Sequence, residues 1–396
     1  MGAAGREEIQ IRSYEERSDR TRVVDLERRC GVGLAERSSL LMDTMGDPIA
    51  RIRNTPLHNV LVAEREGQLV GVVMGTLKVV TLRNPPTDRA RVGYILGLRV
   101  SPLHRRRGIA TRLVRRLEHW FLAHAADYAY MATHPQNAPS IALFVDNLGF
   151  RRFRTPVILL HPIARPLRDR PPPQVDVTRV DPSDGERLYR TNMGSAEFFP
   201  HDIGAVLANR LSLGTWVACP RGREWGDPGS SWAMASVWDC GEVYKLRVGK
   251  TAWRWRAYAK ARRWADRAVP CLRPGTPDLF RPFGFYFVYG VHAEGPAAGA
   301  VVRGLWEFLR GMARRRGGRC EVMVTEVGGG GDGGDAALMD HVPRCKWVSC
   351  PRDVWCIKPL LRGDGDGRWR ENWEELRCEW TQIPPTRPLF VDPREV

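Results

Sequence analysis

The sequence predicts an α/β (α+β) protein built on mixed, mostly antiparallel sheets that are flanked by helices. Two β-type segments, 60–64 and 69–80, are joined by the short polar turn 65–68 and are typical of an antiparallel pair. An apolar segment at 93–100 leads through a basic loop into a helical pattern, and a second β-type run follows at 128–133. The same order of strand, loop, helix and strand recurs within 283–327.

The remaining elements of the first half follow from the same patterns. A short strand is expected at 9–12, and helices are expected at about 20–30 and 38–45. The stretch 83–91 contains two adjacent prolines and is typical of a loop.

A proline-rich stretch predicts where the chain divides. Pro171, Pro172 and Pro173 stand among charged residues, which indicates a stiff, extended linker rather than a core element. A chain of 396 residues is also longer than one hydrophobic core usually holds. We therefore expect a first domain at 1–165, a linker at 166–176 and a second domain at 177–396.

The loop between 93–100 and the following helix has the chemistry of a phosphate-binding site. It carries Arg105, Arg106, Arg107 and then Gly108, and the helical pattern opens at Thr111. A helix start presents unpaired N–H groups, and glycine lets the backbone approach an anion closely. Dinucleotide-binding and P-loop motifs fit less well, because neither glycine pattern is present. A basic surface turn that contains a glycine is the alternative.

The pattern Val-x-Pro-x-x-Arg-x-x-Gly-x-Ala at 100–110 resembles motif A of the GCN5-related N-acetyltransferases (GNAT). Asn137, Ser140 and the Leu-Gly-Phe at 148–150 resemble motif B of that family. The resemblance implies the GNAT fold and acetyl-CoA as cosubstrate, bound along the strand and at the loop. The binding residues it implies are Leu98, Arg99, Val100, Arg105, Arg106, Arg107, Gly108, Ile109, Ala110, Thr111 and Asn137.

The recurrence at 283–327 predicts a second, degenerate GNAT-like domain that lacks the loop arginines, with an unrelated α+β domain as the alternative. Several stretches, including 47–53, 197–203 and 390–395, resemble the Hookless family of plant N-acetyltransferases over nearly the whole chain. That resemblance implies a nuclear regulator of hormone-dependent differential growth that acetylates histones.

Acetyl transfer needs a base, because a lysine ammonium has a pKa of about 10.4. Some GNAT members place a glutamate on the strand before the loop, whereas residues 93–96 of this chain include no carboxylate. Tyr94, His134 and Glu64 are the nearest catalytic candidates, and packing, a loop position and a solvated strand end are their structural alternatives. Phe144 stands where many members have a tyrosine acid, and a missing acid costs about 10²–10⁴ in rate.

The net charge of +16 implies attraction to acidic partners. A cationic run at 245–273 is consistent with a basic helix at 250–268, which either packs on the second domain or contacts nucleic acid. No apolar run reaches the ~20 residues of a membrane span, so no membrane partner is expected. The nine scattered cysteines indicate reduced thiols and predict no metal site.

The leading interpretation is an acetyl-CoA-dependent N-acetyltransferase that acts on a protein lysine, with histones among the substrates. The alternative is a catalytically weak or inactive acetyl-CoA-binding regulator that works through protein interactions. Nuclear localisation, with the cytoplasm as a second compartment, follows from the family resemblance alone. A nucleic-acid-binding module is a third hypothesis, which rests only on charge.

Overall fold

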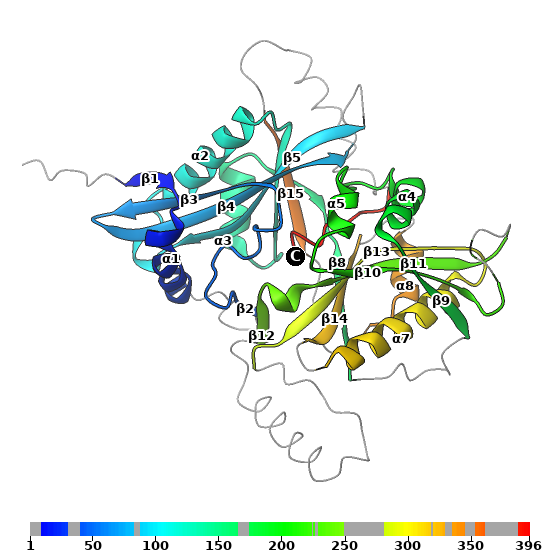
Figure 1. Ribbon diagram of the computed structural model, residues 1–396. Helices are drawn as coiled ribbons and strands as arrows, with labels where there is room; N and C mark the ends of the chain where they lie inside the picture. Colours follow the sequence, from blue (N-terminus) through cyan, green and yellow to red (C-terminus); the bar gives the residue numbers. More distant parts are fainter. Residues whose placement is uncertain are drawn as a thin grey trace, which may run out of the picture.

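Two large sheets lie side by side, and the chain ends between them (Figure 1); the described residues also form a small two-stranded sheet. The computed structural model describes residues 9–30, 40–82, 88–164, 174–223, 225, 229–248, 281–317, 320–328, 335–344, 353–360 and 387–396. The mixed sheets with flanking helices confirm the predicted fold class.

The first sheet has seven strands. In spatial order they are β1 (Gln10–Ser13), β3 (Leu57–Arg65), β4 (Gln68–Thr81), β5 (Arg89–Val100), β6 (Tyr128–Thr133), β15 (Val354–Pro359) and β7 (Arg151–Arg154). The expected hairpin is present as β3 and β4, which pair antiparallel. The strands β5 and β6 are parallel, and helix α2 (Ile109–Ala123) connects them.

The second sheet has six strands. In spatial order they are β8 (Val157–Pro162), β14 (Cys320–Val327), β13 (Gly284–Glu294), β11 (Trp232–Asp239), β10 (Ser212–Pro220) and β9 (Val175–Val180). Helix α7 (Ala298–Arg316) joins the parallel strands β13 and β14, as α2 joins β5 and β6. The strand-helix-strand recurrence expected from the sequence is therefore present.

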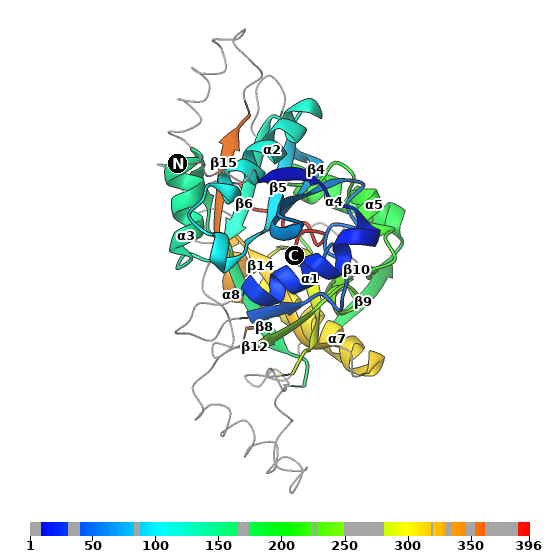
Figure 2. The ribbon, with the colours of Figure 1, turned by 90° about the vertical axis from the view of Figure 1, so that its left-hand side faces the viewer.

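The two sheets exchange strands. Strand β8 precedes the expected linker in the chain but pairs with β14 in the second sheet. Strand β15 comes from the C-terminal part and inserts between β6 and β7 of the first sheet (Figures 1 and 2). The sheets therefore do not separate at 165, and strand β9 begins within the stretch 166–176. The folding units 1–165 and 177–396 stay a prediction.

One local expectation is wrong. The segment expected as a helix at 38–45 contains strand β2 (Leu40–Asp43), which pairs with β12 (Lys245–Val248). Pairing with a strand about two hundred positions along the chain decides this conformation, and the local pattern carries no sign of it.

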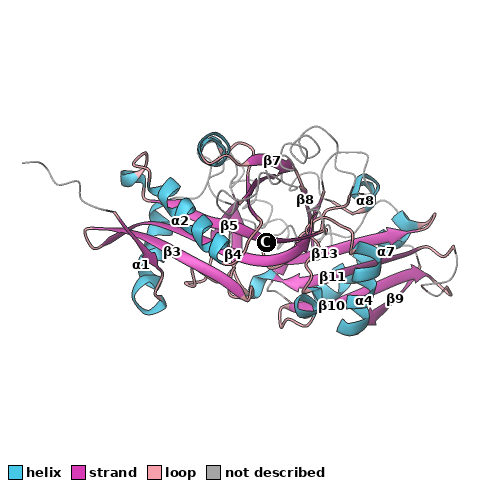
Figure 3. Ribbon diagram, turned by 90° about the horizontal axis from the view of Figure 1, so that it is seen from above, coloured by secondary structure: helices cyan, strands magenta, loops and turns pink. Residues whose placement is uncertain are grey.

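Helices pack against both sheets: α1 (Glu16–Cys30) and α2 lie beside the first sheet, and α4 (Pro182–Met193) and α7 lie beside the second (Figure 3). On the first sheet, α2 packs on one face, and α1 packs on the other. On the second sheet, α7 covers the outer face, while α4 and α5 (Ile203–Leu207) contact the inner one. The inner faces share one hydrophobic core with residues from both halves of the chain. We call this the shared core.

The C-terminal segment 387–396 is built into the shared core. Leu389, Phe390 and Val391 are buried there. The Phe390 amide donates a hydrogen bond to the carbonyl oxygen of Glu197, and the Glu197 amide donates to the carbonyl oxygen of Pro388. The end of the chain is thus a structural element that links the two sheets.

Candidate active site

The site begins where β5 separates from β6. The two strands pair in parallel only from Val92 to Ile95 on β5, although β5 continues to Val100. A register shift against β4 accompanies the separation, and Gly97 adopts a φ of +63° there. A positive φ favours glycine, and bulges bend the strand that carries them. We call the space opened between the two strands the splay.

The loop after β5 leads to an exposed helix N-terminus. Gly108 has a φ of +76° and precedes the first residue of α2, and no side chain in the described part of the chain caps that helix. A Cβ atom placed at Gly108 would meet nothing within 4 Å, so the approach to the helix start is open. Arg105, Arg106 and Arg107 are exposed beside it. Free N–H groups, the helix dipole and three guanidinium groups together suit the pyrophosphate of a coenzyme A.

The other expected cofactor residues line the splay or its ends. Leu98 and Val100 pack toward the α2 side, while Arg99 belongs to the opposite face, and burial lowers the pKa of its guanidinium. Asn137 caps the short helix α3 (Ala138–Ile141), because its Oδ1 accepts a hydrogen bond from the Ser140 amide. The Asn137 amide also donates to Thr133 Oγ1 at 3.0 Å, at the end of β6. Their contacts with the cofactor stay predictions.

Phe144 is an aromatic core residue. Its ring is buried and makes an edge-to-face contact with Phe150, with centroids 5.1 Å apart. A phenylalanine ring has no proton to donate, so this position cannot act as the general acid. The departing thiol is a fair leaving group, with a pKa of about 8.5 by analogy with cysteine.

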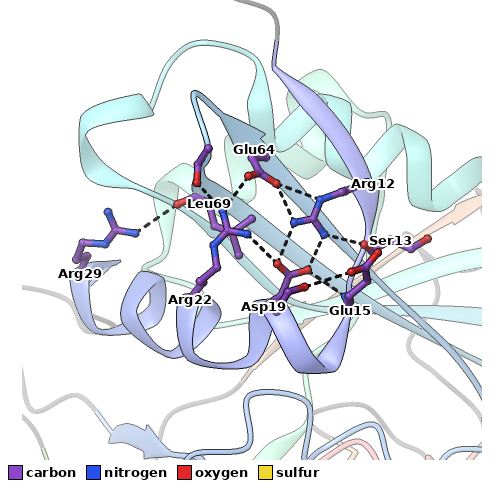
Figure 4. Close-up of polar contacts among 10 residues, drawn as sticks. Arg12, Ser13, Glu15, Asp19, Arg22, Arg29, Glu64 and Leu69 are labelled. Atoms are coloured by element: carbon purple, nitrogen blue, oxygen red, sulfur yellow. Dashed lines mark hydrogen bonds and ion pairs between the residues drawn. The ribbon is translucent and has the colours of Figure 1, made fainter.

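Glu64 belongs to an ion-pair cluster near the β1 edge of the first sheet (Figure 4). Its carboxylate lies 2.8 Å from Arg12 and 2.9 Å from Arg22, and both arginines also pair with buried Asp19. Hydrogen bonds from Arg22 and Arg12 lower the pKa of Glu64. This geometry makes Glu64 a poor proton acceptor and favours a structural role over the expected catalytic one.

Tyr94 and His134 lie at the two sides of the splay. Tyr94 is buried in the shared core and stacks on Tyr130, with ring centroids 4.8 Å apart. Burial raises the pKa of the Tyr94 hydroxyl far above neutrality, so this group is protonated at physiological pH. His134 follows β6, and its Nδ1 accepts a hydrogen bond from the Gln136 amide at 3.2 Å. Their catalytic roles stay predictions.

Sequence reasoning missed a group of carboxylates on the inner face of the splay. Glu326 on β14, Asp353 before β15, and Glu395 near the chain end all influence Tyr94 electrostatically. Burial raises the pKa of each of the three. The stretch 390–395 stood out in the sequence, but no local pattern connects it with Glu326.

Arginines face the same region. Arg51 donates a hydrogen bond to the Glu395 carbonyl oxygen, and its guanidinium lies 5.9 Å from the centre of the Tyr244 ring. The Nε atoms of Arg51 and Arg99 are buried without a hydrogen-bond partner among the described residues. Buried donors of this kind normally have a partner, so these atoms fit a polar ligand beside the splay.

Several expectations fall outside this region. The basic helix expected at 250–268 lies outside the described residues. The cysteines in the described ranges are Cys30, Cys219, Cys240, Cys320 and Cys356; all are buried, and none of them forms a disulfide with another described cysteine. In those same ranges no group of three or more His, Cys, Asp or Glu residues could hold a metal. No helix among them is long and apolar enough to cross a membrane.

Comparisons with known proteins agree with this geometry. Residues 22–150 match the model of the acetyltransferase (GNAT) family. The chain is 39% identical to the Arabidopsis thaliana protein named probable N-acetyltransferase HLS1-like, over 98% of this chain and 99% of that protein. It is also 39% identical to the A. thaliana probable N-acetyltransferase HLS1, over 97% of this chain and 99% of the relative.

A solved structure extends the likeness of fold to both halves. The Saccharomyces cerevisiae N-myristoyltransferase with bound myristoyl-CoA aligns with 90% of this chain and 80% of its own, at 9% identity and a TM-score of 0.53. GNAT proteins use an acyl-CoA and an amine, and the matched residues 22–150 include the splay and the loop at Gly108. The chain belongs to the GNAT acetyltransferases and, within them, to the Hookless-type N-acetyltransferases of plants.

Proposed function

We propose that the protein transfers the acetyl group of acetyl-CoA to the side-chain amine of a lysine in another protein. One observation carries the proposal: β5 separates from β6 after Ile95 and leads through the loop 101–108 to the N-terminus of α2. The backbone exposed along the splay can pair with the pantetheine arm, and the loop can hold the pyrophosphate. The names of the relatives support acetyl as the group transferred.

The acceptor side supports a cationic amine. Glu326, Asp353 and Glu395 all act electrostatically on Tyr94, and carboxylates attract an ammonium group. A lysine carries its charge on a long flexible stem, which suits a site recessed between two sheets.

The finer proposal follows the resemblance to the Hookless family. Histone tails would supply the lysine, the nucleus would be the main compartment with the cytoplasm as the second, and hormone-dependent growth would be the process. The net charge of +16 is consistent with attraction to the DNA of a nucleosome. A fluorescent fusion that stays out of the nucleus would contradict this part.

A transfer assay tests the activity. The purified chain is incubated with acetyl-CoA and a lysine-containing histone-tail peptide, while free thiol and the mass of the peptide are followed. Release of thiol together with one added acetyl group per modified lysine supports the proposal. An unmodified peptide beside bound acetyl-CoA favours a second candidate, a coenzyme-binding regulator, to which buried Phe144 already points.

A further inference from the structure

Glu326 is a carboxylate between the two sheets that has no hydrogen bond or ion pair with any described residue. It pairs in register with Ile158 of β8, and its side chain is half-buried on the inner face of the second sheet. Nearby Glu395, in contrast, lies 2.8 Å from the Lys78 ammonium. Burying a carboxyl group that has no hydrogen-bond partner costs free energy, so packing alone does not explain Glu326.

The strand registers place Glu326 near the open end of the splay. Glu326 pairs with Ile158 on β8, and two residues earlier the Pro156 carbonyl oxygen accepts a hydrogen bond from the Asp353 amide. The next residue, Val354, pairs with Thr133 at the end of β6. The Glu326 carboxylate acts electrostatically on Tyr94, which pairs in register with Tyr130 one position before β5 and β6 separate. This face lies opposite α2, which carries the phosphate-binding loop. An acceptor that approaches the thioester from the inner face therefore passes Glu326.

We propose that Glu326 is the general base that takes the proton from the acceptor amine, and this inference rests on the proposed acetyl transfer. The first half has no carboxylate at 93–96. The second half supplies one across the shared core. The proposed base therefore lies on β14, outside the residues that resemble motif A.

The step balances as follows. The ammonium gives one proton to the Glu326 carboxylate, and the free nitrogen lone pair forms a bond to the thioester carbonyl carbon. The carbon–sulfur bond then breaks, and its electron pair leaves with the sulfur of coenzyme A. The nitrogen releases its second proton to that thiolate, and Glu326 returns its own proton to solvent.

The surroundings of Glu326 tune its basicity. Burial and the neighbouring carboxylates of Asp353 and Glu395 raise its pKa to about 8, while the Arg51 guanidinium lowers it. Among the described residues, the hydroxyls of Tyr94 and Tyr244 also interact electrostatically with Glu326. A base is most effective when its pKa lies near the working pH. The carboxylate accepts a proton only in its ionised form, so the rate should rise with pH up to about 8.

The two neighbouring carboxylates are less suited to this role. Glu395 is held by Lys78 and accepts a hydrogen bond from the Tyr130 hydroxyl. Asp353 faces His134, whose charge lowers the pKa that burial raises. Asp353 is therefore the competing base, and its removal must be measured beside that of Glu326.

The test compares Glu326→Gln with Glu326→Asp, Asp353→Asn and the control Glu321→Gln. Glu321 is half-buried on the same strand. Side chains alternate between the two faces of a strand, so Glu321, five residues before Glu326, lies on the opposite face. For each, acetyl-CoA affinity is measured by calorimetry and kcat/KM from pH 6 to 9. Glu326→Gln should bind acetyl-CoA within about twofold of the unmodified chain, lose about 10²–10⁴ in kcat and lose the rise toward pH 8.

The remaining variants separate the explanations. Glu326→Asp should keep part of the rate, and Glu321→Gln should match the unmodified chain. Unchanged kcat and pH profile in Glu326→Gln would overturn the base assignment alone, and loss confined to Asp353→Asn would move the role there. An unmodified chain that binds acetyl-CoA but acetylates no amine would overturn the proposed function, and the inference with it.

Discussion

The Lys78 ammonium on β4 lies 2.8 Å from the Glu395 carboxylate and 3.4 Å from that of Asp392, near the very end of the chain. All three side chains are nearly inaccessible to solvent. Arg394 extends the cluster by pairing with Asp392 and with Asp202. Two buried carboxylates of the segment 387–396 are therefore paired with a lysine of the first sheet.

Removing Lys78 should be strongly destabilising. The variant Lys78→Met leaves two buried carboxylates with one cation fewer, and breaking a buried pair costs about 3–5 kcal/mol. Urea unfolding measures the loss. The exposed pair Arg187–Asp184 provides the control, since Arg187→Ala should change the free energy of unfolding by less than about 1 kcal/mol. Equal stability of the two variants would contradict a structural role for the cluster.

Glu326 should lower the stability of the ligand-free protein at high pH. Its pKa of about 8 exceeds the 4.5 of a free glutamate, so the folded state holds a proton that the unfolded state has lost. Stability then falls as pH rises from 4.5 to 8. Glu326→Gln removes this dependence. The melting temperature of the variant should therefore increase relative to that of the unmodified chain as pH rises. A difference that is independent of pH would mean that the folded pKa is normal.

Asp19 should have the opposite dependence. Its pKa is lowered chiefly by the hydrogen bond from Arg12, so its contribution is present above the free value of 3.8 and disappears as pH falls below it. Asp19→Asn should cost about 2–4 kcal/mol at pH 7, since Arg12 and Arg22 both lose a partner. Urea unfolding at pH 7 and pH 3 checks this, and an equal cost at both would refute it.

Gly97 should control the shape of the splay. With a φ of +63°, an alanine there is strained, and its Cβ would lie 3.2 Å from the Met74 sulfur. Gly97→Ala should cost about 1–2 kcal/mol and weaken acetyl-CoA binding about tenfold as the bulge relaxes. Gly46→Ala has the same kind of strain with nothing within 4 Å, and should leave binding unchanged. Equal acetyl-CoA affinities for the two variants would show that the bulge at Gly97 does not control cofactor binding.

The parts of the fold that the sequence predicts are those with local signals. The hairpin of β3 and β4 is joined by a short polar turn, and β5, α2 and β6 follow one another with clear periodicity, so each could be identified from its own residues. The repeat of this unit in β13, α7 and β14 is visible for the same reason.

The exchanged strands could not be predicted, because their pairing is not local. Nothing in β15 indicates that it inserts beside β6, and nothing in 38–45 indicates that this segment pairs with β12. The same limit applies to the site. Gly108 and its arginines are adjacent in the chain, whereas Glu326 acts electrostatically on Tyr94 only because the two sheets pack together.

Binding of acetyl-CoA at the loop before α2 is the claim on which the proposed function depends, and calorimetry tests it most directly. The titration compares the unmodified chain, Gly108→Glu and Gly67→Glu. Both glycines have a positive φ and open space around them, so the two variants carry similar strain, but only Gly108 lies at the helix start. Binding by the unmodified chain and Gly67→Glu, abolished in Gly108→Glu, is the expected result. Equal binding by all three, or none by the unmodified chain, would contradict the site.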